Sequence, residues 1–256
     1  MEFGLLGPLL VSDGSSIHAV SSGKQRALLA ALLLRAGWAV RSEQLVETLW
    51  DGLPPRSAEV TLRNYVVRLR RSIGAVGARI RTSPGGYVFD AADEEIDLRI
   101  FDRLRIRAEL ALRVGKVESA DELLDRALAL WRGPALADVA SDTLRRDLCP
   151  ALEEQRLHVL ELKLQVDCAL GRSRVAIPEL VRLTEAYPWR ESLWGQLMVA
   201  YVGSGRQAEA LAVYRRVQRM LADELALRPG AELTALHAEI LAGNVAPRVP
   251  FPALAA

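Results

Sequence analysis

The segment from Ser57 to Phe89 restricts the possible folds of this chain more than any other. Its first part, Ser57–Ile73, has the apolar spacing of a helix, which Ser57 would cap and Gly74 would end. The apolar stripe consists of Leu62, Val66, Leu69 and Ile73. The second part has two short strand-like runs around Pro84-Gly85-Gly86, which predicts a β-hairpin.

The face of this helix opposite the apolar stripe is polar and basic. At about 100° per residue that face carries Val60, Thr61, Asn64, Val67, Arg68 and Arg71, with Arg63 and Arg70 beside it. Arg and Asn side chains can pair bidentately with guanine and adenine edges in the major groove. Residues 1–90 hold 11 Lys/Arg against 7 Asp/Glu, whereas residues 91–256 hold 22 against 25, so the positive charge lies in the first part. This distribution favours phosphate binding by the N-terminal part.

The residues before this segment complete a small α+β domain. Strand-like runs at Phe3–Val11 and Ile17–Val20 predict an antiparallel sheet, and Lys24–Ala36 predicts a helix that ends at Gly37. A second helix should span Glu43–Trp50 with Ser42 as its N-cap. Pro54 and Pro55 require a loop before the third helix. Three helices followed by a hairpin predict a winged helix-turn-helix of the OmpR-like type.

This fold predicts a DNA interface on the third helix and the hairpin. Arg79 and Arg81 should reach phosphates or the neighbouring minor groove. The predicted contact residues are Ser42, Thr61, Arg63, Asn64, Val67, Arg68, Arg71, Arg79, Arg81 and Thr82. The alternative is that the basic helix face is only solvated, but the basic residues converge on the two elements that should meet DNA.

The remaining chain has the pattern of an all-α repeat domain. Gly171-Arg172 and Gly205-Arg206 are 34 residues apart, the period of a tetratricopeptide repeat (TPR). The repeat at Gly205-Arg206 fits this template well, the one before it is weaker, and a third candidate centres on Gly115. An insertion at 131–139 follows the third candidate, and a final helix at about Ala231–Leu241 would cap the stack. We predict a winged helix-turn-helix domain at 1–92, a TPR-like domain at 93–243 and a disordered tail at 244–256. The repeats either bind a partner or serve only to pack and dimerise.

The sequence resembles a known family, the actinobacterial antibiotic regulatory protein (SARP) family of transcriptional activators. The matching segments in the first part are Phe3–Leu9, Lys24–Gly37, Leu49-Trp50, Pro54–Ala58, Thr61–Val66, Leu69–Arg71 and Pro84–Tyr87. Those in the second part, which resemble the family's bacterial transcriptional activation domain, are Leu130–Asp138, Leu152–Glu154, Gly203–Leu211 and Tyr214-Arg215, with Leu236, His237, Ile240 and Leu241.

The resemblance implies an activator of a secondary-metabolite (antibiotic) gene cluster. Such a protein would bind direct repeats in double-stranded promoter DNA near the −35 region and recruit RNA polymerase. The resemblance favours a contact between RNA polymerase, first of all its sigma subunit, and the loop residues Asp51, Leu53, Pro54 and Arg56. The helical domain would add a second contact surface, and the alpha subunit is a further candidate partner. Alternatively, the two prolines only separate the helices. Because one winged helix covers too little DNA for high specificity, we expect a homodimer on sites about 10–11 bp apart.

Other functional classes fit less well. His18, His158 and His237 are scattered, and no nucleophile has an obvious base, so we expect neither an enzyme nor a cofactor. Cys149 and Cys168 lack metal-ligand spacing, and no apolar run is long enough for a membrane helix. We therefore expect a cytoplasmic, nucleoid-associated protein without metal.

The first strand begins at residue 3, so we expect no receiver domain before it. The remaining alternatives are a TPR-like interaction scaffold and a signal-responsive regulator in which the winged helix plays a minor role.

Overall fold

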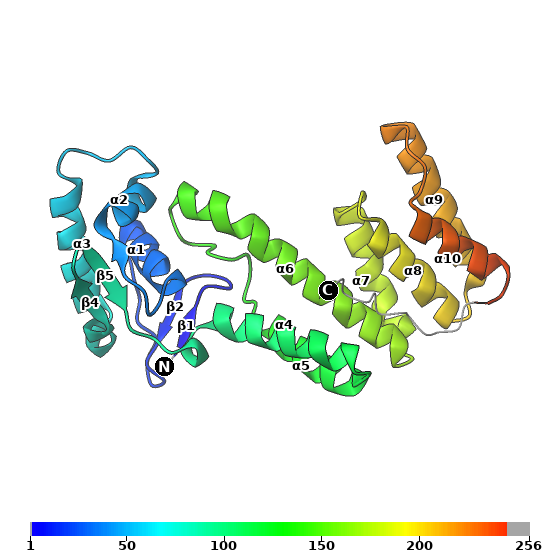
Figure 1. Cartoon of the computed structure of the whole chain (residues 1–256), viewed down its shortest axis with the longest axis horizontal. Coiled ribbons are helices and arrows are strands. Elements are labelled where there is room, and N and C mark those ends of the chain that lie inside the picture. Colours follow the sequence, from blue (N-terminus) through cyan, green and yellow to red (C-terminus); the bar gives the residue numbers. More distant parts are fainter. Residues whose placement is uncertain (1, 245–256) are drawn as a thin grey trace. The chain divides into compact units, whose positions relative to one another are not determined.

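The computed structural model describes residues 2–244 (Figure 1). The chain falls into two compact units, one formed by Met1–Arg105 with Arg126–Leu157 and the other by Ile106–Asp125 with the chain from His158 onward. The predicted disordered tail lies outside the described residues, apart from Asn244. The first unit therefore combines the N-terminal ninety residues with part of the helical domain.

From residue 2 onward, the N-terminal part contains three α-helices, two 3-10 helices and five short strands. Their order is β1 (Glu2–Gly4), β2 (Leu10–Ser12), α1 (Gly23–Leu34), β3 (Val40–Arg41), α2 (Ser42–Trp50), α3 (Ala58–Ser72), the 3-10 helix η1 (Gly74–Arg79), β4 (Ile80–Ser83), β5 (Gly86–Phe89) and the 3-10 helix η2 (Asp93–Glu95). Strands β1 and β2 pair with each other, and the second sheet has the order β3-β5-β4. This is the predicted winged helix-turn-helix, in which β4 and β5 form the wing.

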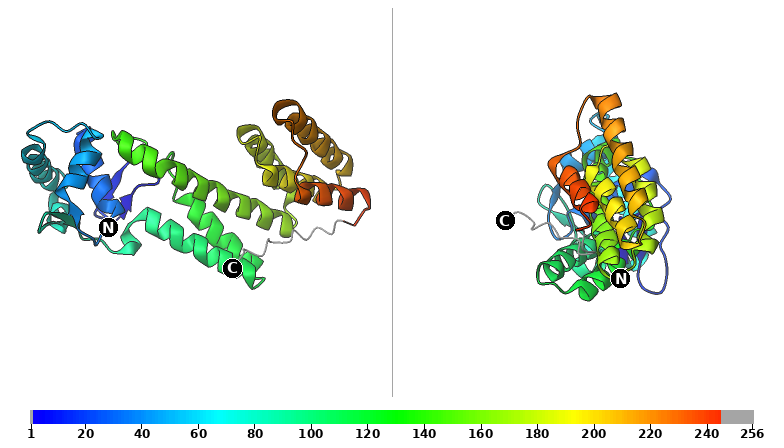
Figure 2. Two further views of the ribbon diagram at one scale, coloured as in Figure 1. Left: turned by 45° about the horizontal axis from the view of Figure 1, so that its top comes forward. Right: turned by 90° about the vertical axis from the view of Figure 1, so that its right-hand side faces the viewer.

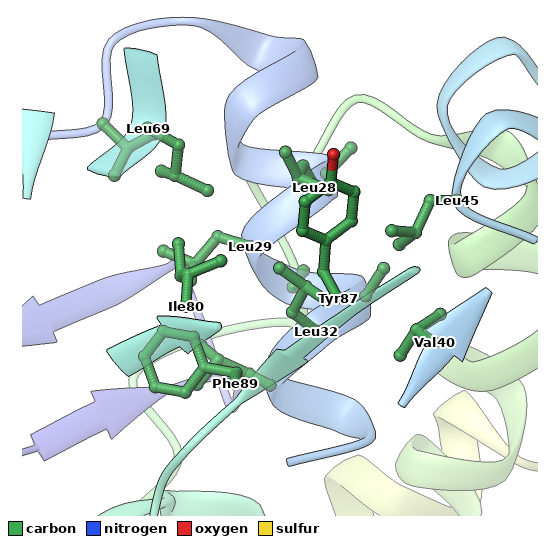
Figure 3. Packing of buried hydrophobic residues seen from close by; sticks show 14 of the residues in the cluster. Leu28, Leu29, Leu32, Val40, Leu45, Leu69, Ile80, Tyr87 and Phe89 are labelled. Carbon is green, nitrogen blue, oxygen red and sulfur yellow. The ribbon is translucent and has the colours of Figure 1, made fainter. Parts of the chain in front are cut away.

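Helix α1 lies at the centre of the core because it is apolar on almost every side. Figure 3 shows Leu28, Leu29 and Leu32 of α1 among side chains from the sheet, and all three are fully buried. Tyr87 and Phe89 of β5 pack against this cluster (Figure 3). The cluster fixes both the wing and α3, whose Leu69 also belongs to it.

The wing is the predicted hairpin, with one additional strand. β4 and β5 pair antiparallel with Arg81 opposite Val88, and Gly85 in the turn has φ +74, where a side chain would be strained. β3 pairs with β5, placing Val40 opposite Tyr87. Strand β3 was not predicted from the sequence.

Three local expectations were wrong. The run Phe3–Val11 is not one strand: it divides into β1 and β2, and the residues between them form a loop. Ile17 takes part only in an isolated bridge with Ser12. Ser42 is the first residue of α2 rather than its N-cap. Ser57 does occupy the N-cap position of α3, as predicted, although its side chain makes no capping hydrogen bond.

The segment predicted as an insertion between repeats, residues 131–139, packs against the N-terminal domain. Leu136 and Val139 are buried in the same cluster as α1, and Leu144 of the following helix joins them. The N–H of Leu136 donates to the carbonyl of Leu5 at 3.0 Å, and the N–H of Arg132 donates to that of Leu6 at 2.8 Å. The loop between β1 and β2 thus finds its backbone partners about 130 residues later in the chain.

Arg132 explains the two glycines of the opening motif. A Cβ at Gly4 would lie 2.0 Å from Nη2 of Arg132, and a Cβ at Gly7 would lie 2.9 Å from its Cβ. The guanidinium donates to the Pro8 carbonyl at 2.7 Å and to the carboxylate of Asp97 at 3.1 Å. Both glycines therefore make room for one side chain from the 131–139 segment.

Up to residue 244, the helical part contains seven α-helices. They are α4 (Asp97–Arg113), α5 (Val117–Ala129), α6 (Asp142–Ala169), α7 (Ser173–Ala186), α8 (Glu191–Gly203), α9 (Gln207–Leu225) and α10 (Ala231–Leu241). In the second compact unit, α8 packs against both α7 and α9, and α10 packs against α8 and α9 (Figure 2). Gly171 and Gly205, with φ +76 and +79, make the turns before α7 and α9. The period of 34 residues therefore predicted the paired helices correctly.

Candidate nucleic-acid interface

Helix α3 presents one exposed face, and its residues are those predicted to read DNA. Asn64, Arg68 and Arg71 are exposed, and Thr61 is half-buried. Val60 and Val67 lie on the same face with 59% and 43% of their surface exposed. Aliphatic side chains between Arg and Asn suit a major groove, because they can contact thymine methyl groups.

The opposite face holds α3 in place. Leu62, Val66 and Leu69 are buried, and α3 packs against α1 and α2. Tyr65, at the edge of this face, stacks on Trp50 of α2 with ring centroids 6.1 Å apart. The apolar spacing in the sequence thus correctly separates the packed face from the exposed face.

The basic residues of the wing have unequal environments. Arg81 is exposed and pairs with Asp90 at 3.2 Å. Arg79 is the last residue of η1, and its guanidinium pairs with Glu95 at 2.8 Å and lies 5.6 Å from the ring centroid of Phe3. The Arg79 side chain is only 28% exposed. Because Arg79 already has an acidic and an aromatic partner, we leave it out of the proposed interface.

Two further predicted residues lie close to the wing. Ser42 is half-buried, and its N–H donates to the carbonyl of Gly85 at 2.9 Å, which joins α2 to the wing turn. Thr82 is exposed on β4, and its hydroxyl oxygen accepts a hydrogen bond from Arg70 at 3.1 Å. Arg70 was not among the predicted contact residues, and only its position beside the polar face of α3 could have indicated it. Arg63, two turns earlier on α3, is exposed.

In the loop between α2 and α3, the first residue holds the start of α6 and the later residues are exposed. The carboxylate of Asp51 accepts hydrogen bonds from the Thr143 N–H at 2.9 Å and from the Ser141 hydroxyl at 3.4 Å, at the start of α6. The Thr143 hydrogen bond is the largest cause of the lowered pKa of Asp51. Leu53 is 85% exposed, and Pro54 and Arg56 are exposed beside it. Asp51 thus caps α6, whereas the residues after it face solvent.

The described residues contain no cluster that resembles a metal site. Within 2–244, no group of three or more His, Cys, Asp or Glu side chains is arranged to hold a metal ion. In the same part of the chain, no helix is both long and apolar enough to cross a membrane.

Comparison with known families assigns both halves of the chain. The family described as "Transcriptional regulatory protein, C terminal" matches residues 19–89, and the "Bacterial transcriptional activator domain" matches residues 96–241. The regulatory protein DnrI of Streptomyces peucetius is 36% identical over 251 residues, which cover 94% of this chain and 92% of DnrI. AfsR of Streptomyces coelicolor is 41% identical over 246 residues, 96% of this chain and 25% of AfsR.

A solved structure has the same fold. Mycobacterium tuberculosis EmbR in complex with a low-affinity phosphopeptide superposes with a TM-score of 0.90 at 35% identity, covering 96% of this chain and 66% of that chain. The sequence of EmbR is 37% identical over 246 residues, and this chain spans 63% of its length. The matches to both domain families and to DnrI over nearly its whole length show that the chain belongs to the SARP family of transcriptional activators.

Proposed function

We propose that the protein activates a secondary-metabolite (antibiotic) gene cluster by binding direct repeats near the −35 region as a dimer and contacting RNA polymerase. The observation that carries the DNA-binding part is the exposed face of α3, which combines Asn64, Arg68 and Arg71 with two exposed valines. DnrI and AfsR, both named regulatory proteins of Streptomyces, support a role in gene regulation. This activity would place the protein in the cytoplasm, with the chromosome.

In this proposal each side chain of the α3 face has a distinct task. Asn64, Arg68 and Arg71 would read base edges, Val67 would contact thymine methyl groups, and Thr61 would lie near a phosphate or the groove floor. Arg63, Arg81 and Thr82 would contact the backbone on the side of the wing. Ser42 would lie close to the DNA through the wing turn to which it is bonded.

Replacing Arg71 tests this orientation. Arg71→Ala should cost about 1–3 kcal/mol of operator binding and relax specificity at one position. Arg81→Ala should instead weaken operator and random DNA alike and reduce the salt dependence of binding. Fluorescence anisotropy at several salt concentrations measures both effects. Equal loss on operator and random DNA for Arg71→Ala would mean that another face of α3 reads the bases.

The dimer follows from the amount of DNA that one domain covers. Two protomers about 10–11 bp apart would lie on the same face of the duplex. Inserting 5 bp between the half-sites should abolish cooperative binding, because it rotates one half-site to the other face. A footprint over a single half-site, with unchanged affinity after the insertion, would contradict the dimer.

The polymerase contact is proposed for the exposed part of the α2–α3 loop. We retain Leu53, Pro54 and Arg56 and assign Asp51 to the support of α6. Two prolines limit the entropy that the loop loses when a partner docks. Leu53→Ala should lower transcription in vitro while operator affinity stays unchanged. Ile17→Ala is the matched control, because Ile17 is 75% exposed outside this loop. Equal transcription from the two variants would exclude a contact through Leu53.

The gene cluster itself can be identified in the source organism. Chromatin immunoprecipitation sequencing should place the protein upstream of the genes of one biosynthetic cluster. Binding sites scattered over unrelated genes would contradict a pathway-specific role.

A further inference from the structure

Arg70 joins the DNA-facing helix to the wing. It lies on the side of α3 next to the exposed face, and its Nε donates to the carbonyl of Ile80 at 3.0 Å. Its Nη2 donates to the hydroxyl of Thr82 at 3.1 Å. The guanidinium is thereby held in one orientation at the seam between α3 and β4.

The charge of Arg70 is not neutralised within the part of the chain that the structure describes. Its neighbours Arg79 and Arg81 pair with Glu95 and Asp90, whereas no carboxylate lies within ion-pair distance of Arg70 in residues 2–244. Partial burial of an arginine without an acidic partner costs free energy, which an external anion would recover.

The remaining hydrogen-bonding capacity at the seam suits a phosphate. A guanidinium has five N–H donors, of which the two described bonds use two, so N–H groups of Arg70 remain for a second acceptor. The Thr82 oxygen accepts from Arg70, so its own hydroxyl proton can be donated elsewhere. Two donors fixed side by side match the oxygens of one phosphodiester group.

We propose that Arg70 and Thr82 together bind one phosphate of the DNA backbone, where the strand passes between α3 and the wing. The site rests on the proposed DNA-binding function and adds to it a contact that fixes the wing relative to the helix. Because the two groups already hold each other, little side-chain entropy is lost when the phosphate binds. Arg63, exposed on the same side of α3, lies along the path of the same strand.

The test is a double-mutant cycle between protein and DNA. The full chain and its Arg70→Met variant are titrated against operator duplexes in which single phosphates are replaced in turn by uncharged methylphosphonate. Arg70→Met should lower operator affinity by about tenfold, the size of one charge-assisted hydrogen bond, and reduce the slope of log K against log salt by about 0.9. One methylphosphonate should weaken wild-type binding and have no effect on Arg70→Met.

Three further variants control for indirect effects. Arg79→Met removes a nearby arginine that is already paired with Glu95, and it should leave the salt slope unchanged. Arg70→Lys should retain the slope because it keeps the charge. Thr82→Val should lower affinity with an unchanged slope and should also weaken the effect of the same methylphosphonate. If Arg70→Met does not fold, as judged by circular dichroism, the lysine and valine variants carry the test.

Failure of this site can be told apart from failure of the proposed function. If Arg70→Met lowers affinity but every methylphosphonate weakens it as much as it weakens the wild type, Arg70 only holds the wing and the phosphate site is wrong. If the wild-type protein binds no duplex DNA in a salt-dependent manner, the DNA-binding function itself is wrong.

Discussion

Asp97 connects three parts of the first compact unit through one buried carboxylate. Its oxygens accept the N–H groups of Leu5 at 2.7 Å and Leu6 at 3.0 Å, and also Nη2 of Arg132 at 3.1 Å. Only 3% of Asp97 is exposed. A buried carboxylate is tolerated because each oxygen has donors and the charge has an arginine partner.

Replacing Asp97 by alanine should therefore destabilise the protein. Two backbone N–H groups would lose their partner, so Asp97→Ala should lower the free energy of unfolding by about 2–4 kcal/mol. Asp138→Ala is the matched control: Asp138 also accepts a backbone N–H, from Leu9 at 2.7 Å, but in an exposed position. Urea denaturation measures both. An equal loss in the two variants would show that burial of Asp97 adds nothing.

Asp51 predicts a dependence of stability on acid. The Thr143 N–H holds the pKa of its carboxyl below the ordinary value of 3.8. A carboxyl group whose pKa is lower in the folded state contributes its full stabilisation above its unfolded-state pKa. That contribution is lost as the pH falls through the folded-state pKa. The stability difference between wild type and Asp51→Asn should thus be constant near neutral pH and shrink below about pH 4. Parallel curves through the acid range, measured by urea denaturation, would rule out this contribution.

The same residues show where sequence reasoning ended. Local spacing correctly separated Arg68 and Arg71 from the buried side of α3, because both faces belong to one helix. It could not show that Arg79 pairs with Glu95, because Glu95 lies beyond the hairpin. Nor could it show that Asp51 accepts the Thr143 N–H at the start of α6, because Thr143 lies 92 residues further along the chain.

At the scale of secondary-structure elements, the sequence predicts those elements that are long enough for their apolar pattern to repeat. Helices α1 and α3 lie within two residues of the predicted ranges, and the wing strands lie where Pro84-Gly85-Gly86 indicated. The prediction of one strand over Phe3–Val11 was wrong because an apolar run has the same pattern in a strand and in a buried loop. Strand β3 has only two residues and shows no alternation.

Two glycines should respond in opposite ways to the same substitution. A Cβ at Gly77 in η1 would lie 2.0 Å from the carbonyl oxygen of Arg70, so Gly77→Ala must shift the turn that leads to the wing. A Cβ at Gly195 in α8 would meet Leu233 at an ordinary 3.6 Å. We expect Gly77→Ala to cost about 1–3 kcal/mol of stability and to weaken DNA binding. Gly195→Ala should gain about 0.5–1 kcal/mol.

Thermal unfolding and operator titration of both variants check this pair of predictions. If Gly77→Ala were as stable as wild type, the turn of η1 would have room for a methyl group beside the Arg70 carbonyl. A loss of stability for Gly195→Ala would mean that α8 and α10 have no room for a methyl group.

At the scale of the whole molecule, the core of the winged helix includes residues from the activation domain. Leu136 is fully buried in the cluster formed around α1 and has φ +53, a conformation that costs free energy for a leucine. Its N–H donates to Leu5 at 3.0 Å, which helps to hold this conformation. The sequence motifs at Phe3–Leu9 and Leu130–Asp138 are thus two sides of one contact.

Leu136→Ala should consequently weaken the DNA-binding part although it lies outside residues 1–92. We expect a loss of about 2–5 kcal/mol and an earlier loss of operator binding on heating. Leu180→Ala in the second unit removes an equally buried leucine and should leave the temperature dependence of operator binding unchanged. Identical binding curves for the two variants, followed by anisotropy during heating, would show that residues 131–139 do not support the winged helix.

The contact between Arg132 and the glycines at 4 and 7 also bears on how regulators of this kind can be recombined. A chimera that exchanges only residues 1–92 would place the β1–β2 loop of one parent against the arginine segment of the other. A mismatch at this contact would disrupt the packing of the buried core around α1 rather than a contact at the surface. A hybrid that also carries residues 126–157 from the same parent keeps this contact intact and transfers the DNA-reading module with its own support.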